Sequence, residues 1–82
     1  MRLVFRVHAI QSMFQSRISE EDVRHVLEDG EIIRNYLDDT PYPSRLVLGR
    51  LASKPVHVVA ADDTETGDTF VVTVYEPDPE LW

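Results

Sequence analysis

Three short apolar runs separated by turn residues fill the second half of the chain, and this pattern limits the fold more than any other feature. The runs are Arg45–Leu51, Val56–Ala61 and Thr69–Tyr75, and Gly, Pro, Ser or Asp residues stand between them. Short segments rich in β-branched residues between such turns are typical of antiparallel strands. Polar and apolar side chains alternate in part of these runs, so one face of the sheet is expected to form a core and the other to display polar groups.

The first half of the chain has the spacing of two short amphipathic helices. Residues 8–18 place five apolar side chains at helical intervals, namely Ala9, Ile10, Met13, Phe14 and Ile18. Ser19 is expected to cap a second helix, with Asp22 completing a capping box and Gly30 ending the helix. Residues 32–37 are expected to form a further strand, whose register is ambiguous because two isoleucines are adjacent.

This order of elements predicts an α+β domain in which two N-terminal helices pack on one face of a three- to four-stranded antiparallel sheet. We expect a single domain over residues 1–82, with residues 76–82 as a C-terminal tail that begins where prolines end the last strand. A chain of this length buries roughly 60% of its unfolded surface and can fold without covalent staples.

Composition excludes several classes of protein. The chain has no cysteine, which rules out disulfides and thiolate metal sites. No apolar run approaches the ~20 residues of a membrane span, and Arg6 and His8 come too early for a signal-peptide core. A cytoplasmic protein without membrane contact is therefore expected.

Charge is distributed unevenly along the chain. The formal net charge of −7 disfavours non-specific binding to nucleic acid. All the acids lie in residues 20–39 and 62–80, and the acid-free segments hold most of the cations: Arg2, Arg6, Arg17, Arg45, Arg50 and Lys54. A basic patch on an acidic body is expected if these segments meet in the fold. The alternative is that charges cluster by chance in a short chain.

Alternation assigns the strand side chains to two faces. Six even-numbered residues of the last two strands are apolar and are expected to face the helices: Val56, Val58, Ala60, Phe70, Val72 and Val74. His57, Thr73 and Tyr75 would then share the open face, which is the face turned away from the helices.

An arginine on this open face would complete a set suited to phosphodiester chemistry. Arg45 joins the face if its strand is regular, whereas a bulge at Gly49 could bring Arg50 across. We expect His57 to act as acid or base, Arg45 as a phosphate clamp and Tyr75 as an orienting group. The histidines have no spacing that specifies a metal, so no metal site is expected.

Four further residues are expected to bind substrate: Arg17, His8, Arg50 and Thr73. Structural alternatives stand beside these roles. His57 could be a buried, hydrogen-bonded residue, and Tyr75 could fasten the strand end to the core. His8 could cap the first helix, and Arg17 could bind the carboxylate of Glu20 or Glu21.

The chain resembles a bacterial family of small proteins of unknown function over nearly its whole length. Six segments carry the resemblance: His8-Ala9, Arg17-Ile18-Ser19, Gly30-Glu31, Asp39-Thr40-Pro41-Tyr42-Pro43-Ser44, Pro55-Val56-His57-Val58-Val59-Ala60 and Thr73-Val74-Tyr75-Glu76-Pro77-Asp78. That family is distantly similar to the RelE and MqsR toxins, ribonucleases with two helices against a small antiparallel sheet. Its members are often encoded beside proteins with a YgiT-type zinc finger.

The resemblance implies a toxin-like ribonuclease, with RNA as substrate and a zinc-finger antitoxin as partner. The reaction would be metal-independent cleavage by attack of the RNA 2′-hydroxyl, with no cofactor. The alternative is a non-catalytic protein–protein interaction domain, since RelE-like toxins are usually basic and this acidic chain suits a basic partner. Convergence of Arg45, His57 and Tyr75 would favour the enzyme, and their dispersal would favour the binding domain.

Overall fold

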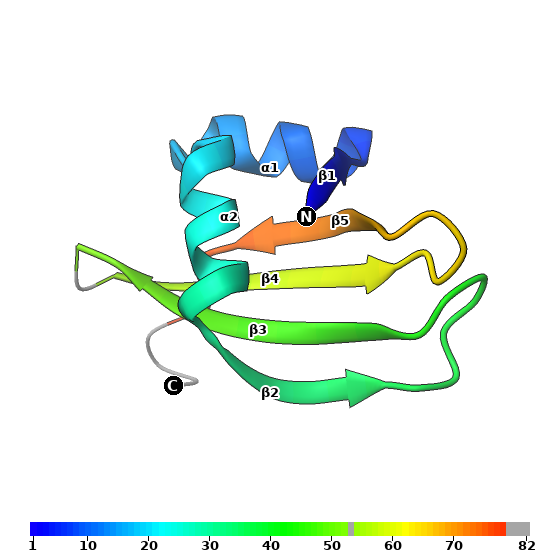
Figure 1. Ribbon diagram of the computed structural model, residues 1–82. Helices are drawn as coiled ribbons and strands as arrows, with labels where there is room; N and C mark the ends of the chain where they lie inside the picture. The colour runs from blue at the N-terminus through cyan, green and yellow to red at the C-terminus, as the bar shows by residue number, and fades with distance from the viewer. Residues whose placement is uncertain (53, 79–82) are drawn as a thin grey trace.

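The computed structural model describes residues 1–52 and 54–78, in which two helices pack against a five-stranded mixed sheet (Figure 1). The elements in chain order are β1 (Arg2–Phe5), α1 (Val7–Ser16), α2 (Glu20–Asp29), β2 (Glu31–Tyr36), β3 (Ser44–Leu51), β4 (Lys54–Asp62) and β5 (Asp68–Tyr75). The α+β class is confirmed. The strand number and the purely antiparallel pairing were predicted wrongly.

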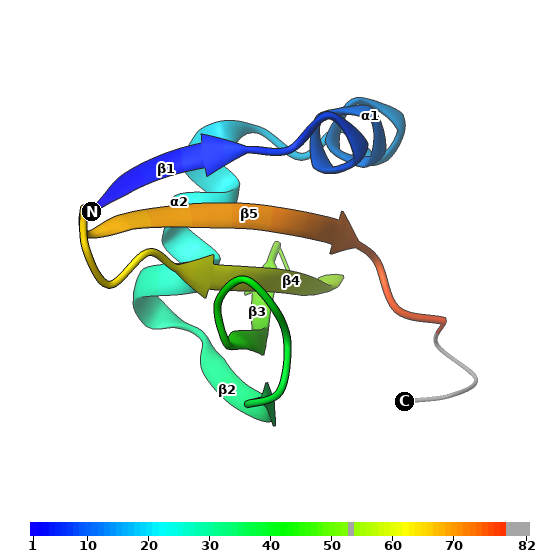
Figure 2. The same ribbon diagram turned by 90° about the vertical axis from the view of Figure 1, so that its right-hand side faces the viewer.

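The difference is β1, an edge strand that pairs in parallel with β5 in the order β1-β5-β4-β3-β2. Figure 2 shows the blue N-terminal strand beside the orange β5, so the first and last strands of the chain are neighbours. Because β1 has only four residues, its alternation is too short to separate a strand from an irregular lead into α1. A parallel partner also needs a long connection, and here both helices and strands β2 to β4 lie between β1 and β5 in the chain.

The helix ends follow local chemistry. Ser19 caps α2 with the predicted capping box: its hydroxyl accepts from the Asp22 N–H at 3.0 Å, and its own N–H donates to Asp22 Oδ2 at 3.0 Å. Gly30 follows the helix as predicted, but its φ of −79° is ordinary. The glycine is needed for space, because an added Cβ would lie 2.4 Å from the carbonyl oxygen of Val26 and 2.6 Å from that of Leu48.

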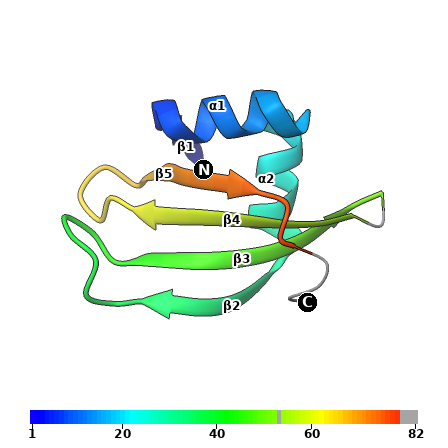
Figure 3. The same ribbon diagram turned by 180° about the vertical axis from the view of Figure 1, so that it is seen from behind.

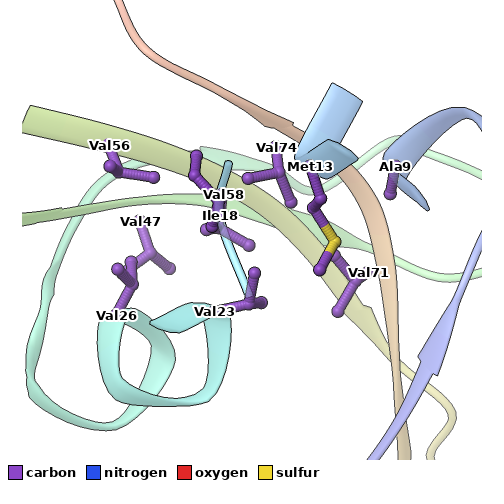
Figure 4. Close-up of a cluster of buried hydrophobic side chains, with 10 residues drawn as sticks. All are labelled: Ala9, Met13, Ile18, Val23, Val26, Val47, Val56, Val58, Val71 and Val74. Atoms are coloured by element: carbon purple, nitrogen blue, oxygen red, sulfur yellow. The ribbon is translucent and has the colours of Figure 1, made fainter. Parts of the chain in front are cut away.

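The core lies between the helices and the sheet and is built mainly from small aliphatic side chains (Figure 4). Its members are Ala9, Met13, Ile18, Val23, Val26, Val47, Val56, Val58, Val71 and Val74. Gly49 lies under α2, and a Cβ there would come within 2.7 Å of Val26 Cγ2. The β3–β4 register runs unbroken through Gly49, so this residue permits close packing and forms no bulge.

A bulge does occur between β4 and β5, and it makes part of the predicted face assignment wrong. The register shifts along these strands, with the pairs Val58–Val74 and Ala60–Val71 on either side of the shift. An extra residue in one strand inverts the alternation beyond it. Val71 is therefore fully buried in the core, whereas Val72 is 37% exposed and Phe70 is only partly buried.

The open face of the sheet is the side away from α2, and Figure 3 views the molecule with α2 behind the strands. Residues 76–78 leave β5 there, with Pro77 buried, and residues 79–82 of the predicted tail lie outside the described residues. No helix in the described parts of the chain has the length and apolarity to cross a membrane.

Candidate functional site

A histidine–tyrosine pair lies on the open face where β4 and β5 run side by side. His57 and Tyr75 are register partners, and His57 Nδ1 lies 3.0 Å from Tyr75 Oη. The two rings meet edge to face, with centroids 5.1 Å apart. His57 is only 4% exposed, whereas Tyr75 is 38% exposed. Tyr75 is thus the member of the pair that a ligand can touch, and His57 is the member behind it.

Burial sets the protonation of the pair. It lowers the pKa of His57, because a buried imidazolium loses hydration. Burial also raises the pKa of Tyr75, and the neighbouring Tyr36 raises it further while the Arg34 guanidinium lowers it. At neutral pH the pair therefore consists of a neutral imidazole and a protonated hydroxyl.

Two of the predicted substrate-binding residues share this face with the pair. Thr73 is the register partner of Val59, one alternation away from the His57–Tyr75 pairing. Arg50 pairs with Pro55, again one alternation from His57 on the neighbouring strand. The register alone assigns Arg50 to this face without a bulge, and Arg50 also lines two cavities that include His25 of α2.

The same alternation removes Arg45 from the site. Arg45 pairs with Ala60 on the helix side of the sheet, and its guanidinium Nη1 lies 2.5 Å from Asp62 Oδ2. Thr69 Oγ1 donates to the other oxygen of the same carboxylate at 2.7 Å. The predicted convergence of Arg45 with His57 and Tyr75 is therefore wrong, because packing of β3 against α2 decides which set of side chains turns inward.

Sequence reasoning missed two polar residues of the open face on the edge strand β2. Arg34 pairs with Leu46 and Tyr36 pairs with Ser44, after a register shift next to Ile32. The electrostatic effects of both residues reach Tyr75. The adjacent isoleucines were the available signal, since such a doublet marks the place where an irregularity changes the alternation.

A cavity of about 470 Å³ lies at the end of the sheet, between the α1–α2 junction and the β3–β4 hairpin. Arg17, Arg50 and Lys54 contribute to its lining. Lys54 forms an ion pair with Glu76 at 3.2 Å, and within the described residues neither Arg17 nor Arg50 forms one. Arg17 therefore does not bind the carboxylates that follow it in the sequence.

The predicted basic patch is divided by the fold. Arg2 lies 3.9 Å from Asp68, and Arg45 is held by Asp62. His8 is exposed at the start of α1, and it does not cap the helix, whose N-cap is Arg6. Among the described residues, no three His, Cys, Asp or Glu side chains gather as metal ligands would.

A family model described as "Domain of unknown function (DUF4258)" matches residues 5–76. No curated protein and no solved structure matches the chain. The matched range runs from the last residue of β1 to the residue after β5, so it contains both helices and His57, Tyr75 and Arg50 of the open face. The chain belongs to the DUF4258 family of domains of unknown function.

Proposed function

We propose that this domain is an endoribonuclease that holds an RNA phosphodiester on its open face and uses Tyr75 as proton donor. The observation that carries the proposal is the hydrogen bond between buried His57 and the accessible Tyr75 hydroxyl, 3.0 Å long. Arg50, which the β3–β4 register assigns to the same face, is the cation proposed for the phosphate. The resemblance to RelE and MqsR, which also set two helices against a small sheet, supports the same assignment.

The proposed reaction is attack of a ribose 2′-hydroxyl on the adjacent phosphorus. The new O2′–P bond forms as the P–O5′ bond breaks, which gives a 2′,3′-cyclic phosphate and a 5′-hydroxyl end. The 2′-hydroxyl loses its proton to water, and Tyr75 donates its proton to the leaving O5′. The guanidinium of Arg50 stabilises the negative charge that develops on the phosphoryl oxygens.

His57 acts in this scheme as a positioning residue, because it is buried behind Tyr75. The tautomer that carries its proton on Nδ1 donates to Tyr75 Oη and leaves the hydroxyl hydrogen free for the substrate. The same N–H stabilises the phenolate that remains after proton donation. The Arg34 charge, which lowers the pKa of Tyr75, acts in the same direction.

The test is cleavage of a single-stranded RNA of mixed sequence by the purified chain, with the end groups of the products identified. We expect cyclic phosphate ends and a loss of cleavage when the 2′-hydroxyls are replaced by hydrogen. Tyr75→Phe should lower the rate by about 10²- to 10⁴-fold, the range for loss of a general acid. Arg50→Gln should lower it by about 10- to 150-fold, as expected for a hydrogen bond to a charged group.

Arg45→Gln is the matched control for Arg50→Gln, because Arg45 is on the other face and bound to Asp62. It should leave the cleavage rate unchanged. Equal rates for wild type and Tyr75→Phe would overturn the proposal, as would a loss of activity in Arg45→Gln equal to that in Arg50→Gln. In cells, induced wild type should arrest growth with loss of RNA, and Tyr75→Phe should not.

A second function, binding of another protein, is favoured by the separation of Arg45 from His57 and Tyr75 and by the outer surface of α1. Val7, Ile10 and Phe14 form an apolar stripe on this helix and are 70%, 51% and 87% exposed. An unpartnered apolar stripe of this kind is typical of a protein-binding surface. If induced wild type and Tyr75→Phe both leave growth and RNA intact at matched soluble expression, the interaction domain becomes the better description.

A further inference from the structure

The segment Asp39–Ser44, which links β2 to β3, forms one wall of a second cavity on the open face. This cavity has a volume of about 200 Å³, and β5 supplies Phe70 to its lining. A hydrogen bond of 2.5 Å from Ser44 Oγ to Asp39 Oδ2 ties the two ends of the segment together. The cavity is smaller than the roughly 300–1,000 Å³ of pockets that hold drug-sized ligands. It suits one ring system.

Planar groups line this cavity. The rings of Tyr42 and Phe70 lie 6.1 Å apart and within 11° of parallel. The guanidinium carbon of Arg6 lies 4.8 Å from the centroid of the Phe70 ring. The Asp63 carboxylate raises the pKa of the Tyr42 hydroxyl. Two aromatic rings and a guanidinium plane are the groups on which unpaired bases stack in single-stranded RNA complexes.

We propose that this cavity is a nucleobase subsite that takes one unpaired base of the RNA that the proposed function would cleave. The base stacks on Phe70 and Tyr42. The Asp39 carboxylate has acceptor capacity beyond its bond to Ser44, so it accepts from an exocyclic amino group. Adenine, guanine and cytosine carry such a group and uracil does not, so uracil binds most weakly.

The place of the cavity relative to Tyr75 agrees with this assignment. Val59 lines the cavity, and His57 lies two residues away on the same strand and the same face, roughly 7 Å along β4. A base in the subsite therefore directs its sugar and phosphate toward the His57–Tyr75 pair. Stacking also supplies the affinity that phosphate contacts alone give weakly to a chain with a net charge of −7.

The experiment is an NMR titration of the full chain with the four nucleoside 5′-monophosphates and with ribose 5-phosphate. We expect the ring resonances of Tyr42 and Phe70 to shift with the nucleotides, with uridine monophosphate weakest and ribose 5-phosphate without effect. Phe70→Leu should weaken binding by about 5- to 150-fold, the range for loss of one base–aromatic stack. Phe14→Leu, the same change at the exposed surface of α1, should leave binding unchanged.

Tyr42→Leu is a second variant, needed in case Phe70→Leu disturbs the fold. It alters the connecting segment between β2 and β3 and should weaken nucleotide binding in the same range. Asp39→Asn should reduce the difference in affinity between uridine monophosphate and the other three nucleotides. Equal binding of ribose 5-phosphate would overturn the subsite, as would shifts confined to the Arg17–Arg50 cavity. Nucleotide binding without RNA cleavage would contradict the proposed function alone, and cleavage without nucleotide binding would contradict the subsite alone.

Discussion

The two faces of one small sheet differ in what fills them. On the helix side the neighbours of α2 are valines and a glycine, and Val56, Val58 and Val74 are between 0% and 1% exposed. On the open face the same strands carry His57, Tyr75 and an arginine. On the helix side, close packing limits which side chains fit. On the open face, hydrogen bonding and charge are the properties that matter.

This difference indicates which substitutions the chain tolerates without loss of stability. The helix side is packed so closely that a Cβ added at Gly30 or Gly49 would overlap neighbouring atoms. Apart from the buried His57, the polar side chains of the open face are partly or fully exposed, so substitutions of them cost less folding energy. Stability and activity should therefore respond to different sets of substitutions.

The largest loss of stability is expected for Gly30→Ala at the junction of α2 and β2. The new Cβ would lie 2.4 Å and 2.6 Å from two backbone carbonyl oxygens, which cannot rotate away as a side chain does. We expect the free energy of unfolding to fall by about 3 kcal/mol, at the upper end of overpacking costs. Urea denaturation followed by circular dichroism measures it.

Gly67→Ala is the control for Gly30→Ala. Gly67 has φ of +79° and nothing within 4 Å of an added Cβ, so only backbone strain is introduced. That strain costs about 1 kcal/mol. If Gly30→Ala is no more destabilising than Gly67→Ala, the close contact between α2 and the sheet is not what limits this position.

Two neighbouring valines of β4 allow the packing of the two faces to be compared directly. Val58 is fully buried against the helices, whereas Val59 points to the open face and is partly exposed. Val58→Ala should cost about 2 kcal/mol, from the lost methyl groups and the cavity they leave. Val59→Ala should cost less than about 1 kcal/mol, since less area is buried and the loss of strand propensity is similar. Equal losses in urea denaturation would show that the open face is packed as tightly as the core.

Sequence reasoning recovered the parts of the fold that local signals determine. The capping box at Ser19 and Asp22 and the three strands of the second half are all present. Those signals are local: hydrogen-bonding side chains at fixed spacing, and β-branched runs between turns. The edge strand β1 has no such signal, because only pairing with β5 at the other end of the chain identifies it.

The candidate site was less predictable, because alternation fails wherever register shifts. Because of the bulge in β5, Val71 lies in the core where Phe70 was expected. Because β3 packs on α2, the register assigns Arg50 to the open face where Arg45 was expected. His57 and Tyr75 were placed together correctly, since both lie on the same side of the bulge. Tertiary packing, which the pattern of one strand does not contain, decided the other positions.

The last prediction concerns pH and His57, the buried titratable side chain of the open face. Burial lowers the pKa of His57 in the folded protein below its unfolded value near 6.5. Below pH of about 6.5 the unfolded chain therefore binds a proton at His57 that the folded chain does not, and this difference lowers stability as pH falls. Above that pH the residue is neutral in both states and contributes no pH dependence.

We therefore expect the free energy of unfolding of the wild type to fall between pH 7 and pH 5, and the fall to be smaller in His57→Gln. Glutamine can still hydrogen-bond to Tyr75 but does not titrate, so the comparison isolates the proton from the loss of a contact. His8→Gln, at an exposed position on α1, should keep the wild-type slope. Urea denaturation at each pH gives the three slopes. A His57→Gln slope equal to that of the wild type would mean that the imidazole is as well hydrated in the fold as in the unfolded chain, and Tyr75 would then lack the neutral, buried partner on which its role as a proton donor depends.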